Sequence, residues 1–392
     1  MSDTVVESQM AILRRRPELE RREADQLSAL AALSRDALHV HGPDVDPAPS
    51  TRTYFQRDWN RVMHSEAFRK LEYKTQVFPF GEGLDVTRTR LTHTLEVSQI
   101  AQAICVALGL NDDLVRAIAL AHDLGHPPFG HSGEDVLREL AGFNHNAHGL
   151  RIVTELEKRY PFPGLNLTTV VLEGMEKHDA DFRALGEYAY FRDEGPTLES
   201  QVASLADVIA YRSHDIEDAL NSGILTKDDF REAGLDLWDE LETHVADLPE
   251  DIRTAQITRT LIDLFISDAL TEMQQRLSHT GTSTAADVRA VREPLVRFSA
   301  EFERKQSRLG EFLREAFYKH YKIMRMTDKG QRVIRALIGA YQDNPRLLPP
   351  DVQVRYEETE DRNAVLADVI AGMTDRYAVM EYTRLFDPEV RV

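Results

Sequence analysis

The stretch AHDLGHPPFGHSGE, Ala121–Glu134, decides how the rest of this 392-residue sequence is interpreted. It gathers three histidines, two carboxylates, three glycines and two prolines into fourteen positions. Pro127 and Pro128 cannot continue a helix, because proline lacks a backbone donor and its ring clashes with the preceding turn. A fold alone rarely concentrates imidazoles where a helix must break, so this segment indicates a chemical site.

The composition of the whole chain argues against several classes of protein. The net charge is −19 and the isoelectric point is near 5.2, whereas a general binder of nucleic-acid backbones carries a basic face. DNA is therefore at most a secondary partner. The single cysteine, Cys105, cannot form an internal disulfide, which is typical of a reducing compartment. No run approaches the roughly 20 apolar residues of a membrane helix, and no signal-peptide core is present, so we expect a cytoplasmic protein without a membrane span.

The hydrophobic periodicity is helical almost throughout, and no convincing series of alternating strands is present. This pattern predicts an all-α fold. We expect an N-terminal helix and Pro-rich loop over 1–50, a catalytic core over 51–225 and a C-terminal helical region over 226–392. Gly109 and Asn111 mark the end of one helix and the start of the next. Helices are expected over 7–38, 53–73, 89–108, 112–125, 132–140, 145–159, 168–178, 199–220, 227–244, 251–278, 286–326, 331–341, 361–371 and 373–385.

The adjacent pair His122–Asp123 falls at the end of a predicted helix, where it could bind a metal ion. Neighbouring helical side chains point about 100° apart, but a ring nitrogen and a short carboxylate can still reach one ion. Two further ligands are available on other predicted helices, His93 in RLTHT and Asp207 in SLADVIAY. Two imidazoles and two carboxylates suit a borderline or hard divalent ion such as Mn²⁺, Fe²⁺ or Mg²⁺.

A competing hypothesis pairs His122 with His126, which are four positions apart and would share a helical face. Gly125 and the two prolines oppose this hypothesis, because they predict that the helix stops before His126.

Six longer segments resemble the motifs of one known family, the HD-domain deoxynucleoside triphosphate triphosphohydrolases of the bacterial dGTPase-like type. In chain order they are AFRKLEYKTQVF, TRLTHTLEVSQIA, AHDLGHPPFGHSGE, NHNAHGLRI, SLADVIAYRSHDIEDAL and AGMTDRYA, and they extend from about residue 52 to about residue 384. The resemblance implies an HD-domain helical core with additional C-terminal helices. It also implies that the four metal ligands are His93, His122, Asp123 and Asp207.

The family's reaction cuts a dNTP between the sugar 5′ oxygen and the α-phosphorus, which releases a deoxynucleoside and intact triphosphate. This chemistry needs an activated water, neutralisation of the triphosphate charge and a proton for the departing alkoxide. By resemblance, His126 and His131 would face the α-phosphate. Glu134 would orient a histidine, and His145 would protonate the 5′ oxygen.

The resemblance also implies four substrate-binding residues. Arg90 matches a phosphate-contacting arginine, and Gln76 matches a residue at the 3′ end of the sugar. Tyr211 would pack beside the sugar, where it gives a steric reason to reject ribonucleotides. Asp215 would take the 3′-hydroxyl.

The resemblance leaves the roles of three features of the sequence unexplained. Asn144 and His148 stand where many relatives have glutamate and glutamine, respectively. These two departures affect what we expect of the residues around the site, but not the expected reaction. The segment Met373–Ala378 resembles a C-terminal family motif, for which packing across a subunit boundary is our first interpretation. A basic segment is either a solvated face with local salt bridges or a binding surface for triphosphate or an effector; it comprises Arg57, Arg61, Arg69, Lys70 and Lys74.

The family often forms homo-oligomers, commonly hexamers, that dNTPs activate allosterically, and we expect the same of this chain.

Two alternatives to the proposed reaction stay open. One is another HD phosphohydrolase, such as a 5′-nucleotidase or an alarmone or cyclic-nucleotide hydrolase. The other is a non-catalytic, nucleotide-responsive binding protein.

Overall fold

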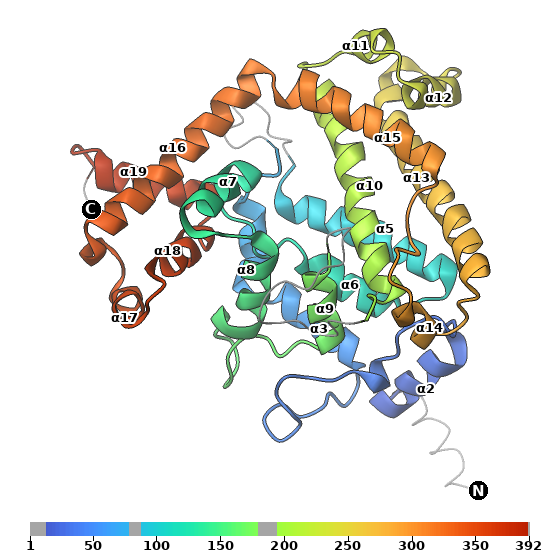
Figure 1. Ribbon diagram of the computed structural model, residues 1–392, viewed down its shortest axis with the longest axis horizontal. Coiled ribbons are helices and arrows are strands. Elements are labelled where there is room, and N and C mark those ends of the chain that lie inside the picture. The colour runs from blue at the N-terminus through green and yellow to red at the C-terminus, as the bar shows by residue number, and fades with distance from the viewer. Residues whose placement is uncertain (1–12, 78–87, 179–193, 391–392) are drawn as a thin grey trace, which may run out of the picture.

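The structure is a computed structural model that describes residues 13–77, 88–178 and 194–390. The predicted all-α fold is confirmed, because the described part of the chain consists of helices, turns and two isolated β-bridges. Figure 1 shows the helices after residue 320, drawn in deep orange and red, gathered on one side of the molecule. Among the described residues, no helix is both long enough and apolar enough to cross a bilayer.

The N-terminal half of the chain contains the helices that surround the opening motif. Their bounds are α2 (Arg16–Gln26), α3 (Tyr54–Met63), α4 (Glu66–Lys70), α5 (Arg90–Leu108), α6 (Asp112–Ala121), α7 (Gly130–Ala141), α8 (His145–Arg151), α9 (Thr169–Glu176) and α10 (Leu198–Asn221). Shorter helical turns are η2 (Ser34–Asp36), η3 (Leu71–Tyr73) and the π-helical turn η4 (Ile152–Leu156).

The C-terminal half is also helical. Its elements are α11 (Lys227–Glu232), α12 (Asp236–Val245), α13 (Glu250–Thr280), α14 (Ala285–Ala290), α15 (Ala300–Leu313), the π-helical turn η6 (Arg314–Tyr318), α16 (Tyr321–Asp343), η7 (Pro345–Leu347), α17 (Pro350–Glu358), α18 (Arg362–Ala371) and α19 (Asp375–Phe386).

Local capping signals set the two helices that carry the metal-binding candidates. The Thr89 side chain accepts a hydrogen bond from the backbone of Thr92 at the start of α5, and Gly109 ends that helix with a φ of 65°. The Asn111 side chain accepts from the backbone of Leu114 and so caps α6, as predicted. These ends could be predicted because each depends on residues within one turn.

Several predicted helices were too long. The predicted helix over 7–38 ends at Gln26 in the described residues, and its first six positions lie outside them. The predicted helix over 53–73 divides at Ser65, whose hydroxyl accepts from the Phe68 backbone and starts a new helix. Helix α6 stops at Ala121 and not at Gly125, since a tight turn follows.

Further corrections concern the C-terminal half. The predicted helix over 227–244 divides at Gly234, which has a φ of 58°. The predicted helix over 286–326 is three helices, because Pro294 lies between α14 and α15 and η6 precedes α16. Helix α16 then absorbs the predicted helix over 331–341. Helix α17 was not predicted.

Two hydrophobic cores organise the part of the chain that the structure describes. The larger one is built around α10, which packs against α5, α6 and α13. The smaller one joins α7 to the C-terminal helices, with Val136 and Leu137 of α7 against Leu337 of α16 and Ile370 of α18. The C-terminal helices therefore rest directly on the helix that carries the end of the opening motif.

Candidate active site and metal centre

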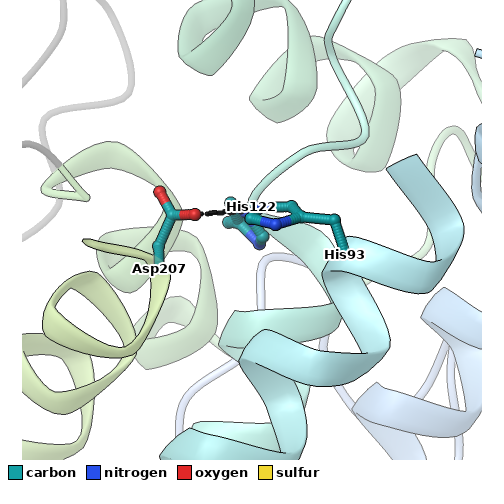
Figure 2. A group of neighbouring side chains, drawn as sticks. All are labelled: His93, His122 and Asp207. Atoms are coloured by element: carbon teal, nitrogen blue, oxygen red, sulfur yellow. Dashed lines mark ion pairs between the residues drawn. The ribbon is translucent and has the colours of Figure 1, made fainter. Parts of the chain in front are cut away.

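Three of the predicted metal ligands converge from three elements. His93 comes from α5, His122 follows the last residue of α6, and Asp207 lies on α10, as Figure 2 shows. Their donor atoms all lie within 4.8 Å of one another. His93 Nε2 is 2.9 Å from Asp207 Oδ1, and His122 Nε2 is 3.8 Å from the same oxygen.

Asp123, the fourth predicted ligand, adjoins this group without entering it. Its Oδ1 is 3.5 Å from His122 Nε2, and its Oδ2 is 3.8 Å from His93 Nε2. The same carboxylate lies closer to Arg90 Nη1, at 3.0 Å, and to His126 Nε2, at 3.1 Å. Asp123 thus lies between the three converging ligands and the predicted catalytic histidine.

The chemistry of these donors fits a divalent cation. His122 is buried, and its Nδ1–H is assigned as the donor to the Ala119 carbonyl at 2.6 Å. No described residue forms a hydrogen bond with its Nε2. Burial lowers the pKa of His122, which favours the neutral imidazole. Burial alone would raise the pKa of Asp207, but hydrogen bonds from His178 and His93 hold it well below its usual range. Neutral imidazole and ionised carboxylate are the forms that bind metal ions.

Two buried histidines that the sequence analysis did not identify support these ligands. His93 Nδ1 is 3.3 Å from His214 Nδ1, and His214 in turn pairs with the Glu96 carboxylate. His178 Nε2 is 3.2 Å from Asp207 Oδ2. Helical spacing could have identified His214, because it follows Asp207 by seven positions and shares its face of α10.

A second group contains His126, Glu134 and His145. His145 Nδ1 lies 2.9 Å from Glu134 Oε1, and the backbone N–H of His145 donates to the same oxygen at 3.1 Å. The rings of His126 and His145 stack with centroids 3.9 Å apart. His131 lies at the solvent-exposed edge of this group. Its side chain is 67% exposed, and its Nδ1 is 3.6 Å from Glu134 Oε2.

Charge within the second group is set by burial and by hydrogen bonds. Burial alone would raise the pKa of Glu134, but hydrogen bonds from His131 and His145 hold it well below its usual range. Burial and the charge of Arg90 lower the pKa of His126 well below its usual value. His126 and His122 do not share a helical face, because α6 ends at Ala121, so the competing hypothesis for this pair is wrong.

Arg90 is buried at the boundary between the two groups. One nitrogen, Nη1, binds Asp123, while Nε and Nη2 have no hydrogen-bond partner within the described ranges. Gly130 makes room for this guanidinium: a Cβ built there would lie 2.9 Å from Arg90 Nη2, and the φ of Gly130 is 57°. The glycine therefore allows the start of α7 to approach Arg90 closely.

Among the described residues, two of the three other predicted substrate residues, Asp215 and Gln76, also keep a buried polar atom without a hydrogen-bond partner. Asp215 is buried, its Oδ1 accepts from the Tyr318 hydroxyl at 2.5 Å, and its Oδ2 has no hydrogen-bond partner in residues 13–77, 88–178 and 194–390. Burial raises the pKa of Asp215 to about 8. Tyr211 stacks on Tyr318 with ring centroids 6.4 Å apart, and Gln76 Oε1 is buried without a hydrogen-bond partner in the described part of the chain. Tyr318 was not predicted, since it lies more than one hundred positions along the chain from Asp215 and no local pattern connects them.

The segment Met373–Ala378 is bonded, within this chain, to the loop between α6 and α7, residues 122–129. Phe129 has a φ of 64°, which is unusual for a residue with a side chain. Asp375 Oδ1 accepts from the Phe129 N–H at 2.9 Å, and its Oδ2 accepts from the N–H of Thr75 at 3.0 Å and from the Thr75 hydroxyl. Lys74 adds a second link, because its Nζ donates to the carbonyls of His126 and Ala371 at 2.6 and 2.9 Å.

Two departures from the family pattern have local structural roles. The Asn144 side chain caps α8 by accepting from the backbone of Ala147 at 3.0 Å. His148 Nδ1 lies 3.0 Å from the Gly125 carbonyl. Gly125 itself allows this approach, since a Cβ there would lie 1.9 Å from the carbonyl oxygen of His145.

The basic segment is not one solvated face. Arg57 and Arg61 are buried and pair with Asp46 at 3.3 and 2.8 Å, which fixes the Pro-rich loop. Lys74 is buried, whereas Arg69 is exposed.

Family models match two parts of the chain. Residues 90–212, which include all four predicted metal ligands, match the model of the HD domain. Residues 296–384, which include Tyr318 and Asp375, match the model of a phosphohydrolase-associated domain.

Curated relatives match nearly the whole chain. Proteins from Bordetella pertussis and Geobacter sulfurreducens are each 44% identical to it, over 92% and 95% of this chain and 97% and 98% of their own lengths. A protein from Bradyrhizobium diazoefficiens is 41% identical, over 88% of this chain and 94% of its own length. All three carry the name deoxyguanosinetriphosphate triphosphohydrolase-like protein. The chain therefore belongs to the deoxyguanosinetriphosphate triphosphohydrolase-like family of HD-domain hydrolases.

Proposed function

We propose that the chain is a metal-dependent dNTP triphosphohydrolase that releases a deoxynucleoside and inorganic triphosphate. One observation carries this proposal: five of the predicted site residues each keep a buried polar atom that has no hydrogen-bond partner among the residues that the structure describes. These atoms are Gln76 Oε1, Arg90 Nη2, His122 Nε2, His126 Nδ1 and Asp215 Oδ2. Because proteins pair the great majority of their buried polar groups, unpaired atoms in a predicted site support binding of a polar ligand there.

In this proposal, the metal ion would be held by His93, His122, Asp123 and Asp207. The donor set suits Mn²⁺, Mg²⁺ or Fe²⁺. Once bound, such an ion supplies Lewis-acid activation of water and neutralises phosphate charge.

The protein groups around the ion would bind and protonate the substrate. The unpaired nitrogens of Arg90 suit the non-bridging oxygens of a phosphate. His126 and His131 would lie on the α-phosphate side. The Glu134 carboxylate accepts the Nδ1–H of His145 and would stabilise an imidazolium whose Nε2–H is donated to the departing 5′ oxygen.

The sugar would lie against α10. Asp215 Oδ2 is free to bind a 3′-hydroxyl, and a pKa of about 8 keeps this carboxyl largely protonated near neutral pH. Tyr211, one turn earlier on the same helix, would exclude a 2′-hydroxyl by steric contact. Gln76 would contact the 3′ end of the sugar.

The test is a product assay with each of the four dNTPs, alone and in mixtures, with Mn²⁺ and with Mg²⁺. The proposal predicts equal amounts of deoxynucleoside and intact triphosphate. Release of pyrophosphate or single phosphates would instead identify another HD phosphohydrolase. Nucleotide binding without turnover would identify a nucleotide-responsive binding protein.

Two further proposals follow from family membership. We propose a cytoplasmic homo-oligomer that dNTPs activate, and a rate with mixed dNTPs above the sum of the separate rates would support activation. Exposed apolar side chains on α19, namely Tyr377, Met380 and Phe386, are candidates for a subunit contact. Analytical ultracentrifugation at several protein concentrations measures the oligomeric state.

A further inference from the structure

A line of polar side chains runs from the protein surface to the candidate metal centre, between α5 and α10. These two helices pack against each other and carry the predicted ligands His93 and Asp207 (Figure 1). His93 Nδ1 lies 3.3 Å from His214 Nδ1, and His214 Nε2 pairs with the carboxylate of Glu96. Both imidazoles are buried, whereas Glu96 is only half-buried. Glu96 is therefore joined to a predicted ligand through one intervening ring.

The contacts along this line determine where the ring hydrogens lie. Two ring nitrogens that face each other at 3.3 Å can share only one hydrogen, because one must donate and the other must accept. An ionised carboxylate only accepts, so the hydrogen between His214 and Glu96 belongs to Nε2 of His214. The neutral ring of His214 then has its lone pair at Nδ1, and the hydrogen between the two rings is assigned to Nδ1 of His93.

This order of hydrogens makes His93 Nε2 the nitrogen that can bind an ion. Nε2 is 2.9 Å from Asp207 Oδ1, on the side where the three converging ligands meet. A histidine binds a metal ion through one ring nitrogen that has lost its hydrogen, while the other nitrogen donates its own hydrogen to a neighbour. The opposite order would place the lone pair of His93 at Nδ1, where it faces His214 and not Asp207.

Arg88 holds the Glu96 carboxylate in place and in its charged form. Arg88 Nε is 3.2 Å from Glu96 Oε2, and the same guanidinium pairs with Glu217 at 2.8 Å and with Asp218 at 3.3 Å near the end of α10. Burial alone would raise the pKa of Glu96, but the hydrogen bond from His214 and the charge of Arg88 hold it below its usual value. A charged acceptor forms a stronger hydrogen bond than a neutral one, so Glu96 favours one tautomer of His214.

We propose that Glu96 is a positioning residue of the metal centre, because it fixes the hydrogen of His93 at Nδ1 through His214. The inference rests on the metal-dependent function proposed above. Glu96 acts on His93 only through the intervening ring, so the effect of removing Glu96 should disappear when His214 is already absent. A residue that merely stabilises the packing of α5 on α10 would have the same effect in both cases.

A double-mutant cycle tests this dependence through the affinity for Mn²⁺, measured by competition titration without nucleotide. The full-length proteins are the wild type, Glu96→Ala, His214→Ala and the double variant. Glu96→Ala should bind Mn²⁺ about tenfold more weakly than the wild type, which is the lower end of the usual effect of removing such a partner. In the His214→Ala background, the same substitution should change the affinity by less than about twofold.

The matched control is Glu217→Ala in both backgrounds. Among the described residues, Glu217 pairs with the same arginine but not with His214. Each control should bind Mn²⁺ as its parent does, and thermal melting checks that all proteins are folded. Three results would each overturn the proposal: an unchanged affinity of Glu96→Ala, an equal effect of Glu96→Ala in both backgrounds, or an equal loss in Glu217→Ala.

Nitrogen-15 NMR of labelled histidine rings locates the hydrogens in the wild type itself, in Mg²⁺ buffer. The spectrum of His214→Ala identifies the signals of His214. The proposal predicts a hydrogen on Nε2 of His214 and none on Nδ1, and a hydrogen on Nδ1 alone would overturn it. Neither experiment uses a dNTP, so both stand if the proposed hydrolytic reaction is wrong. A wild type that binds no Mn²⁺ would instead contradict the proposed metal centre, and the positioning role with it.

Discussion

Asp207 is the residue on which the metal-binding group depends most. Its carboxylate lies 2.9 Å from His93, 3.8 Å from His122 and 3.2 Å from His178. A buried group of imidazoles needs this negative charge to bind a cation. A cation in the protein interior is poorly solvated unless an opposite charge lies beside it.

We therefore predict that Asp207→Ala abolishes both metal binding and hydrolysis. Elemental analysis of the purified protein and the product assay measure the two effects. Glu217→Gln is the matched control, since Glu217 is a carboxylate on the same helix that pairs with Arg88. Near-normal activity of Asp207→Ala at low metal concentration would contradict the assignment.

His214 acts on the metal-binding group through His93. The contact of 3.3 Å between their Nδ1 atoms fixes the ring of His93 with Nε2 toward Asp207. We predict that His214→Ala weakens binding of Mn²⁺ by about 10- to 100-fold, the usual effect of removing the partner of a metal-bound histidine. A competition titration measures the affinity, with the exposed His244→Ala as control. An unchanged affinity would remove His214 from the site.

Asp215 gives the stability of the fold a defined dependence on pH. Burial raises its pKa from 3.8 to about 8, so between these values the folded protein holds a proton that the unfolded chain has released. This residue therefore contributes stability that is fully present below about pH 4 and is lost as the pH rises through about 8. We predict that Asp215→Asn reduces the loss of unfolding free energy between pH 5 and pH 8. Urea denaturation at both pH values measures it, and equal losses in the wild type and the variant would contradict the assigned pKa.

At the scale of elements, the loop between α6 and α7 contacts the C-terminal helices α16 and α19, and these contacts fix its conformation. Phe129 adopts a left-handed backbone conformation, which persists in proteins where the surroundings impose it. Asp375, at the start of α19, accepts the Phe129 N–H, and Gly330 of α16 leaves room for its ring: a Cβ there would lie 2.9 Å from Phe129 Cγ.

We predict that Asp375→Asn lowers kcat by about tenfold or more and leaves metal affinity nearly unchanged. The amide keeps one acceptor but cannot serve both Phe129 and Thr75, so the loop moves relative to the metal group, and small displacements of catalytic groups are costly. Asp387→Asn, at the exposed end of α19, is the control. If metal affinity and kcat fall together, Asp375 supports the whole fold and not the loop alone.

The sequence predicted those elements whose limits depend on nearby residues. Asn111 and Gly109 set α6 and α5 because a cap acts within one turn. The break at Ser65 was not predicted, since a serine starts a helix only when the chain turns to present its hydroxyl. Helix α17 was not predicted either, although Pro350 stands at its first position, where proline is favoured.

At the scale of the whole molecule, residues far apart in the chain complete the site. Phe129 of the HD region contacts Asp375 of the phosphohydrolase-associated region, and Asp215, just beyond the residues of the HD match, contacts Tyr318 of the same associated region. The candidate metal ligands could be proposed from motifs, whereas these long-range contacts depend on how α7 packs on α16 and α18 and have no local signal. The division into segments 1–50, 51–225 and 226–392 stays a prediction.

The central claim is that the chain directs water to the α-phosphorus of a dNTP. Hydrolysis of a dNTP in ¹⁸O-labelled water, followed by mass spectrometry of both products, tests this claim most directly. We predict one labelled oxygen in each inorganic triphosphate and none in the deoxynucleoside. Label in the 5′-hydroxyl of the deoxynucleoside, or in pyrophosphate or single phosphate, would contradict it.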